Sequence, residues 1–245
     1  MTKKIRLDEL LVSERMAADV RTAGALVLSG RVFLGGQRLD KPGTLVAAGE
    51  RIRLRNEPPR YVSRGGFKLE AALAALRIQV RNRVCLDLGA STGGFTDCLL
   101  QHGAREVFAL DVGKGQLDWK LRQDPRVLVL EGINARLLSP GHLPRPPELA
   151  TADLSFISLR LILPRLELFP ELELLLLVKP QFEAFQGEVE AGGVIRNPEK
   201  RREILNRFKE FVSSSEFQLQ AEFHSPVHGR KGNRETFFHL SRRPD

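Results

Sequence analysis

The stretch Val84-Cys85-Leu86-Asp87-Leu88-Gly89-Ala90-Ser91-Thr92-Gly93-Gly94-Phe95 decides the fold of this 245-residue chain. Its apolar first half predicts a buried strand, its three glycines predict a tight turn, and the residues from Phe95 onward predict a helix. Such a turn lets the backbone come close to a ligand, and the start of the helix presents free N–H groups. The stretch therefore predicts a ligand site at a strand-to-helix junction.

Two residues of the turn discriminate between cofactors. A dinucleotide fingerprint would have glycine where Ser91 stands, and the carboxylate of Asp87 would sit badly beside a pyrophosphate. That carboxylate can instead order the loop or meet a cationic methionine moiety. Asp111 closes the next predicted strand, near the ~20-residue spacing at which an acidic side chain meets ribose hydroxyls. The turn favours S-adenosylmethionine over NAD. A nicotinamide-dependent reductase is therefore the least favoured function.

Strands and helices alternate on both sides of this stretch. Apolar runs predict strands at 84–88, 106–111, 127–131, 149–154 and 174–178, and helices at 67–76, 95–102 and 198–212. Alternation of this kind predicts an α/β fold, a Rossmann-like parallel sheet with crossover helices. The segments 217–222 and 234–240 predict two terminal strands that could run antiparallel.

The N-terminal quarter has a different pattern. Two short helices are predicted within 7–28, a β-hairpin around Gly35-Gly36 and a half-exposed strand at 51–55, which together indicate a small α+β domain. Prolines at 58 and 59 break regular structure, so we predict domains at 1–58 and 63–245 with a linker at 59–62. Residues 1–60 hold 12 Lys or Arg and 7 Asp or Glu, which is +5 of the net +8. This excess favours RNA as a partner, and a basic surface that only aids solubility is the alternative.

Composition also limits the classes of protein. Two cysteines, Cys85 and Cys98, make no disulfide framework and fit a cytoplasmic location. The five histidines lack metal-ligand spacing, so we predict no metal site. No apolar run approaches the ~20 residues of a membrane-spanning helix, and the N-terminus lacks an apolar signal core.

Polar residues occur at two more predicted strand ends. Asp153 and Lys179 stand where ligands of open α/β sheets bind, outside the carboxyl ends of the strands. Either residue alone could be an ordinary strand exit, but with the glycine-rich turn they define one cleft. Lys68 and Glu235 cannot be interpreted from periodicity, and each alone is more often a surface charge.

These residues occur in a series of motifs along nearly the whole chain. The motifs are Arg6-Leu-Asp8-Glu-Leu-Leu, Asp40-Lys41-Pro42-Gly43, Ser63-Arg64-Gly65-Gly66-x-Lys68-Leu69, the stretch from Asp87, Asp111-Val-Gly113-x-Gly115, Asn134-Ala-Arg136, Asp153-x-Ser155-Phe-Ile-Ser158, Val178-Lys179-Pro180-Gln-Phe-Glu183 and Lys231-Gly-Asn233-x-Glu235. In this order they resemble the TlyA or hemolysin-A-like family of rRNA 2′-O-methyltransferases.

The resemblance implies a fold, a cofactor and a site. Residues 1 to about 58 would form an alpha-L RNA-binding module, and the rest an FtsJ-like class I methyltransferase that acts on rRNA or ribosomal subunits, with cytidine as the suggested nucleoside. A catalytic tetrad would comprise Lys68, Asp153, Lys179 and Glu235. S-adenosylmethionine would be bound by Asp87, Gly89, Ala90, Ser91, Thr92, Gly93, Gly94, Phe95, Asp111, Val112, Asn134 and Asp153. Lys114 and Ile133 depart from the family pattern near the expected cofactor pocket.

The chemistry of 2′-O-methylation suggests roles for the tetrad. A ribose hydroxyl needs a base, and lysine acts as one only if a second cation or burial lowers its pKa. We therefore expect Lys179 to be the base, Lys68 the neighbouring cation, Asp153 the residue that orients Lys179, and Glu235 the residue that positions Lys68 or the hydroxyl. A protein that kept the fold as an inactive RNA- or ribosome-binding assembly factor is the alternative.

Overall fold

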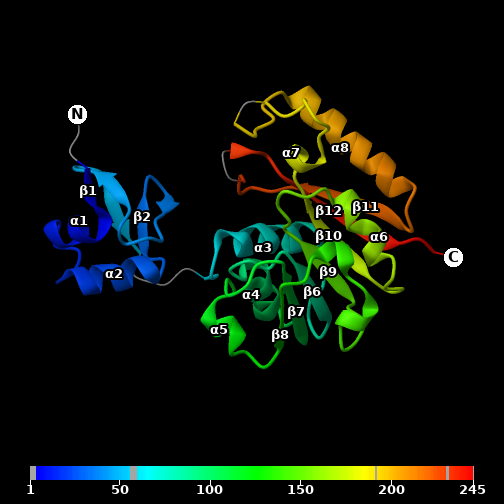
Figure 1. The fold of residues 1–245 in the computed structure, drawn as a ribbon, viewed down its shortest axis with the longest axis horizontal. Helices are drawn as coiled ribbons and strands as arrows, with labels where there is room; N and C mark the ends of the chain where they lie inside the picture. Colours follow the sequence, from blue (N-terminus) through cyan, green and yellow to red (C-terminus); the bar gives the residue numbers. More distant parts are fainter. Residues whose placement is uncertain (1–3, 56–59, 191, 230–231, 245) are drawn as a thin grey trace. The chain divides into compact units, whose positions relative to one another are not determined.

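The computed structural model describes residues 4–55, 60–190, 192–229 and 232–244. The chain divides into two compact units, Met1–Arg60 and Tyr61–Asp245 (Figure 1). Residues 56–59, where we predict the boundary and the start of the linker, lie outside the described residues. Tyr61 and Val62, assigned above to the linker, instead pack within the second unit. The Tyr61 ring is buried edge-on against Phe67, with 5.2 Å between ring centroids, and the Val62 N–H donates to Asp97 Oδ2.

The first unit combines two helices with five short strands. The helices are α1 (Leu7–Ser13) and α2 (Val20–Leu28). One sheet pairs β1 (Lys4–Arg6) with β4 (Leu45–Ala47), and the other has the order β3 (Gln37–Arg38), β2 (Val32–Leu34), β5 (Ile52–Leu54). The predicted hairpin is confirmed, because Gly35 and Gly36 both adopt positive φ between β2 and β3. The β1–β4 pair was not predicted, since three-residue strands carry almost no periodic signal.

A seven-stranded sheet organises the second unit, in the order β11-β12-β10-β9-β6-β7-β8. The strands are β6 (Val84–Leu88), β7 (Glu106–Asp111), β8 (Val127–Glu131), β9 (Leu149–Ala152), β10 (Glu173–Val178), β11 (Phe217–His224) and β12 (Thr236–Arg242). The five strands from β10 to β8 are parallel, whereas β12 and β11 are antiparallel, as the sequence allowed. This is the predicted Rossmann-like α/β arrangement.

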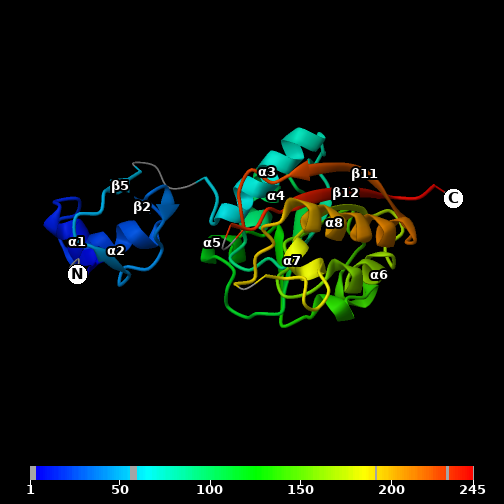
Figure 2. The same ribbon diagram turned by 90° about the horizontal axis from the view of Figure 1, so that it is seen from above.

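Helices cover both faces of the sheet. Figure 2 shows α3 (Arg64–Leu76) and α4 (Gly94–Gln101) on one side, and α6 (Leu163–Leu166) and α8 (Pro198–Ser213) on the other. Two further short helices are α5 (Trp119–Arg122) and α7 (Pro180–Glu183). The connections from β7 to β9 contain little helix, and we predicted none there: β8 is followed by two 3₁₀ turns in a segment with prolines at 140, 144, 146 and 147.

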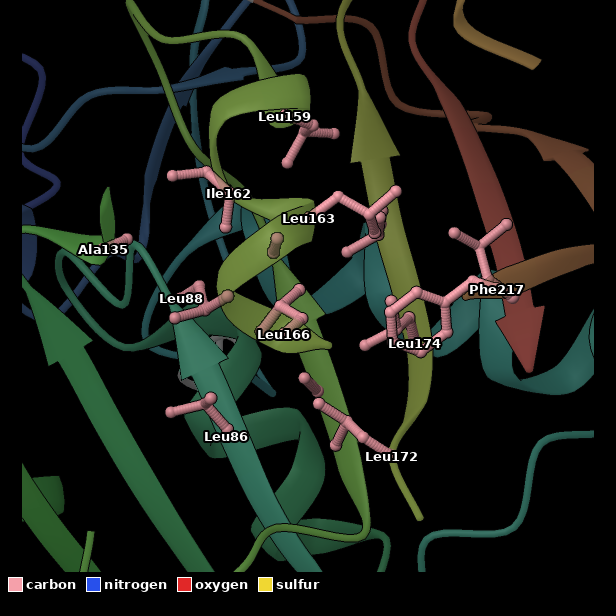
Figure 3. Packing of buried hydrophobic residues seen from close by; sticks show 14 of the residues in the cluster. Leu86, Leu88, Ala135, Leu159, Ile162, Leu163, Leu166, Leu172, Leu174 and Phe217 are labelled. Atoms are coloured by element: carbon pink, nitrogen blue, oxygen red, sulfur yellow. The ribbon is translucent and has the colours of Figure 1, made fainter. Parts of the chain in front are cut away.

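The buried strands divide their side chains between two cores by simple alternation. Leu86 and Leu88 of β6 join the core under α6 and α8, where Figure 3 shows them near Leu163 and Leu166. Cys85 joins the core under α3 and α4. The same alternation holds in β10 and β7. Odd-numbered positions of these three strands therefore face α3 and α4, and this fixes the face on which their terminal polar residues lie.

Glycines allow α3 and α4 to pack closely. A Cβ on Gly66 would lie 2.3 Å from Cγ of Tyr61, and a Cβ on Gly94 would lie 3.0 Å from the backbone nitrogen of Gly66. Ser63 caps α3 by accepting a hydrogen bond from the Gly65 N–H at 3.3 Å. The Gly65-Gly66 pair thus lets the first turn of α3 approach the start of α4, directly beside the glycine-rich turn.

Gly66→Ala is expected to destabilise the protein although alanine favours helices. The new methyl group would collide with the buried Tyr61 ring, and overpacking of this kind costs about 1–3 kcal/mol. Gly65→Ala is the matched control, because the nearest atom there is the Ser63 hydroxyl at 3.3 Å. Urea unfolding monitored by circular dichroism compares the two. Equal unfolding free energies for both variants would contradict this packing argument.

Candidate active site

Strand register brings three predicted site residues to one edge of the sheet. Asp153 directly follows β9 and Lys179 directly follows β10, so both lie at the carboxyl ends of adjacent parallel strands. Val178 pairs with Thr236 of the antiparallel β12, which places Glu235 at the same edge. All three continue the odd-numbered face, toward α3 and α4.

The predicted tetrad forms two ion pairs. Lys68, in the second turn of α3, donates from Nζ to Glu235 Oε2 at 2.6 Å, and both residues are buried. Lys179 Nζ lies 2.6 Å from Asp153 Oδ1, with 8% of the Lys179 side chain and 22% of the Asp153 side chain exposed. Lys68, the cation that we expected beside Lys179, is therefore paired with Glu235. The contacts fit orienting roles for both carboxylates, and the roles remain proposals.

The Asp153 loop and α7 supply further neighbours of Lys179 that we did not predict from the sequence. Lys179 Nζ donates to Ser155 Oγ at 3.0 Å and lies 5.9 Å from the ring centroid of Phe182. Phe156 has φ of +65° and is 91% exposed, with its ring centroid 5.2 Å from that of Phe182. A large apolar ring held outward by an unfavourable backbone conformation is a feature of binding sites. Its only sequence signal was membership of the Asp153-x-Ser155-Phe motif.

Gly229 and Glu183 support the two ion pairs. A Cβ on Gly229 would lie 2.2 Å from Glu235 Oε1, so glycine makes room for that carboxylate. The Glu183 carboxylate is buried, accepts from Ser158 Oγ at 2.5 Å and from the Leu159 N–H at 2.8 Å, and so ties α7 to the loop after β9. Burial raises the pKa of Glu183, while these two hydrogen bonds and Arg160 act in the opposite direction.

Asp87 is fully buried at the base of the glycine-rich turn. Its carboxylate accepts from Thr96 Oγ1 of α4 at 2.6 Å and from Thr151 Oγ1 of β9 at 3.3 Å. Burial raises the pKa of Asp87 to about 7, the negative charge of Asp153 also raises it, and the two threonine hydrogen bonds lower it. Of the two functions expected for this carboxylate, the contacts support ordering of the loop.

The glycines of the turn are explained by packing rather than by ligand approach alone. Gly89 and Gly93 have φ of +81° and +95°. A Cβ on Gly93 would lie 2.2 Å from Leu121 Cδ1, and one on Gly89 would lie 3.1 Å from the backbone oxygen of Asp153. We expected Gly93 to give a ligand access to the backbone, and the structure shows instead that its missing side chain admits Leu121. A bulky residue at 93 would disrupt the fold before it affected any ligand.

The outer part of the turn carries the remaining predicted cofactor residues. Asp111 Oδ2 accepts from the Ser91 N–H at 2.8 Å, and its Oδ1 accepts from the Gly113 N–H at 2.7 Å. Ser91 and Thr92 are exposed, and the apolar side chain of Val112 is 68% exposed beside Asp111. Each carboxylate oxygen retains acceptor capacity for a hydroxyl. The acceptor oxygens of Asp111 and the exposed apolar side chain of Val112 fit a ribose and an adenine ring.

Other predicted cofactor residues are distributed between the rim and the interior. Asn134 is exposed and accepts from the Arg136 N–H at 3.0 Å to start a 3₁₀ turn, while Ala90, Gly94 and Phe95 are buried. Lys114, one of the two departures from the family pattern, lies over the loop after β8: its Cε would be 2.7 Å from a Cβ on Gly132. The structure thus places Lys114 between the loops that follow β7 and β8.

The sheet, the turn after β6 and the acidic end of β7 define a Rossmann-like methyltransferase fold joined to a small α+β unit. The sequence matches the FtsJ-like methyltransferase family over residues 61–242 and the S4 domain over residues 5–52. The chain belongs to the FtsJ-like methyltransferase family and carries an N-terminal S4 domain. Within the described residues no helix is long and apolar enough to cross a membrane, and no group of three or more His, Cys, Asp or Glu could hold a metal ion.

Relatives match almost the whole chain. YqxC of Bacillus subtilis, named as a candidate rRNA methyltransferase, is 44% identical over 98% of this chain and 86% of its own length. The 16S/23S rRNA (cytidine-2′-O)-methyltransferase TlyA of Mycobacterium tuberculosis is 41% identical over 100% of this chain and 92% of its own length. A solved structure of a candidate hemolysin from Streptococcus thermophilus is 40% identical, with a TM-score of 0.76 over 99% of this chain and 90% of that one. The family resemblance inferred from the motifs is confirmed.

The raised pKa of Asp87 predicts a pH-dependent stability. An unfolded aspartate titrates near ~3.9, so between that pH and about 7 the folded protein binds the extra proton. The free energy of unfolding should therefore fall as pH rises through this window, by a few kcal/mol in order of magnitude. Asp87→Asn should remove this part of the dependence of the unfolding free energy on pH. Chemical unfolding at a series of pH values tests it, and parallel stability curves for the two proteins would show that Asp87 is ionised in the native state.

Proposed function

We propose that this chain transfers a methyl group from S-adenosylmethionine to a ribose 2′-hydroxyl of rRNA, with cytidine as the nucleoside. The observation that carries the proposal is the pair of lysine–carboxylate contacts at the sheet edge next to the turn after β6. The relative from Mycobacterium tuberculosis, a 16S/23S rRNA (cytidine-2′-O)-methyltransferase that matches the full chain, supports the nucleoside and the substrate class.

The cofactor site is proposed to use the exposed rim of the turn. Ser91 and Thr92 would face the cofactor, Asp111 would hold its ribose, and Val112 would cover one face of its adenine, because these groups are exposed or retain acceptor capacity. Asp153 would contribute from the neighbouring strand. When bound, S-adenosylmethionine supplies an electrophilic methyl group on a positively charged sulfur.

The tetrad is proposed to prepare the hydroxyl for attack. Lys179, once neutral, would accept the 2′-hydroxyl proton at Nζ while the oxygen forms its bond to the methyl carbon, whose bond to sulfur breaks. Asp153 and Ser155 both contact Nζ, and the remaining position on this nitrogen would face the substrate. The Lys68–Glu235 pair would hold the ribose in place beside it.

The S4 unit is proposed to supply affinity for RNA. Residues 1–60 carry a formal charge of +5, and the side chains of Arg51, Arg53 and Arg55 are exposed on alternate positions around β5. Arg55 lies with its guanidinium carbon 4.5 Å from the ring centroid of Phe33, an arrangement that presents both groups to a nucleic acid. An rRNA substrate agrees with the cytoplasmic location expected from the cysteines.

The proposed function is tested by mapping ribose methylation. The 2′-O-methylated positions of 16S and 23S rRNA are compared between cells that contain the gene and cells that lack it, and purified protein is then added to rRNA from the deficient cells. Restoration of a lost cytidine methylation supports the proposal. S-adenosylmethionine binding by calorimetry without any transfer would favour the inactive assembly factor.

Lys179→Ala is expected to lower methyl transfer by roughly 10²- to 10⁴-fold, the effect of losing an acid–base group. Lys179→Arg should fail as well, because a guanidinium keeps its proton at any accessible pH. Single-turnover transfer of tritiated methyl groups measures both, and S-adenosylmethionine binding shows that the variants remain competent. Because the lost amine leaves Asp153 without its partner, thermal unfolding is recorded for each variant. Near-normal transfer by a folded Lys179→Arg protein would remove Lys179 as the base.

A further inference from the structure

The four residues of the tetrad cancel one another in charge. Lys68 is paired with Glu235 and Lys179 with Asp153, so two cations are balanced by two anions in this part of the cleft. RNA brings one negative phosphate with every nucleotide, and neutralisation by Lys or Arg supplies most of the affinity for such a backbone. The phosphates that flank the reacting ribose must therefore be held by cations outside the tetrad.

Two arginines lie next to the Lys68–Glu235 pair in the chain. Arg64 is exposed at the first position of α3, one helical turn before Lys68 and on the same face. Arg234 is exposed and directly precedes Glu235. Arg64 is therefore close in the chain to the lysine of this buried ion pair, and Arg234 is next to its glutamate.

The third arginine comes from the first turns of α8. The buried side chain of Asn233 accepts from the Ile195 N–H at 3.2 Å and donates to the Gly193 oxygen at 2.9 Å, which fastens the segment before α8 to the residue before Arg234. Arg201 follows on α8. Burial, and then the positive charge of Arg234, lower the pKa of the Arg201 guanidinium, as expected when two cations lie near each other.

Several neighbours of these three arginines, though not Arg202, form ion pairs within the described part of the second unit. Close by on the same segments, Arg196 pairs with Glu190, and Lys200 and Arg207 both pair with Glu188. Among residues 60–190, 192–229 and 232–244, no carboxylate forms an ion pair with Arg64, Arg201 or Arg234. Arg201 and Arg234 lie near each other without a counter-charge, and an anion that binds between them would relieve their repulsion.

We propose that Arg64, Arg201 and Arg234 form a phosphate-binding rim that grips the RNA backbone on either side of the ribose to be methylated. The rim rests on the proposed function, since it assigns the substrate contacts of the same site. Guanidinium is suited to this task, because its planar donors bind two oxygens of one phosphate at once. The rim lies in the catalytic unit and is thus separate from the basic surface of the S4 unit.

The test measures how binding of the full-length protein to deproteinised 16S and 23S rRNA depends on salt. Dissociation constants are determined by filter binding over a series of KCl concentrations for Arg64→Gln, Arg201→Gln, Arg234→Gln and the triple variant. Each lost phosphate contact should reduce the slope of log affinity against log salt by about 0.7 to 1, and the triple variant should show the sum. Arg234→Lys keeps the charge and should keep the slope while binding more weakly.

Arg81→Gln is the matched control. Arg81 is exposed just before β6, at the amino ends of the parallel strands and so at the opposite edge of the sheet from the site. Arg81→Gln should leave the slope of log affinity against log salt unchanged. A triple variant that is folded by thermal unfolding and has the wild-type slope would overturn the rim, as would an equal loss in Arg81→Gln.

The salt slope is measured without turnover, so the two proposals fail separately. If the wild-type protein binds rRNA through the rim but never transfers a methyl group, only the proposed function is contradicted. If the wild-type protein methylates rRNA and the rim substitutions leave the salt slope unchanged, only the rim is contradicted. If the wild-type protein binds no rRNA, both proposals are contradicted.

Discussion

The ion pair between Lys68 Nζ and Glu235 Oε2 joins residues that are 167 positions apart and buries both charges at the edge of the sheet. A buried charge whose partner is removed destabilises a protein by about 3–5 kcal/mol, so α3 and the start of β12 cannot move independently. α3 in turn packs on α4 through Gly66 and Gly94. The glycine-rich turn that precedes α4 is thereby held in a fixed place beside the predicted tetrad.

Strand alternation is the second constraint, and it selects which polar residues meet. Asp87 and Asp111 occupy odd-numbered positions within β6 and β7, and Asp153, Lys179 and Glu235 continue that face just beyond their strands. A shift of one residue in any of these strands would turn its polar residue toward α6 and α8. The core under those helices is built of apolar side chains, and an unpaired charge turned into it would be costly.

Much of the fold followed from the sequence because the buried parallel strands are long apolar runs. The strand at 84–88 was predicted with the bounds that the structure shows, and the same is true of β7 and β8. Asp153 and Lys179 were found by their position at strand ends. Lys68 and Glu235 carry no such local signal, because their significance is a contact between distant segments, and only the family motifs pointed to them. For the same reason periodicity could not show that Gly93 makes room for Leu121.

Charge balance connects the cofactor side of the site to the RNA side. Asp87 lies at the base of the turn, and burial and the charge of Asp153 both raise its pKa, so a cation brought to the turn would favour its ionised form. Asp153 is at the same time the partner of Lys179. In the proposed function, a positively charged cofactor and a negatively charged RNA backbone would both meet this one set of paired charges. Because that set has no formal net charge, we expect it to attract neither ligand strongly by itself. Our proposals therefore assign recognition to other residues: the turn and Asp111 for the cofactor, and the S4 unit and the arginine rim for RNA.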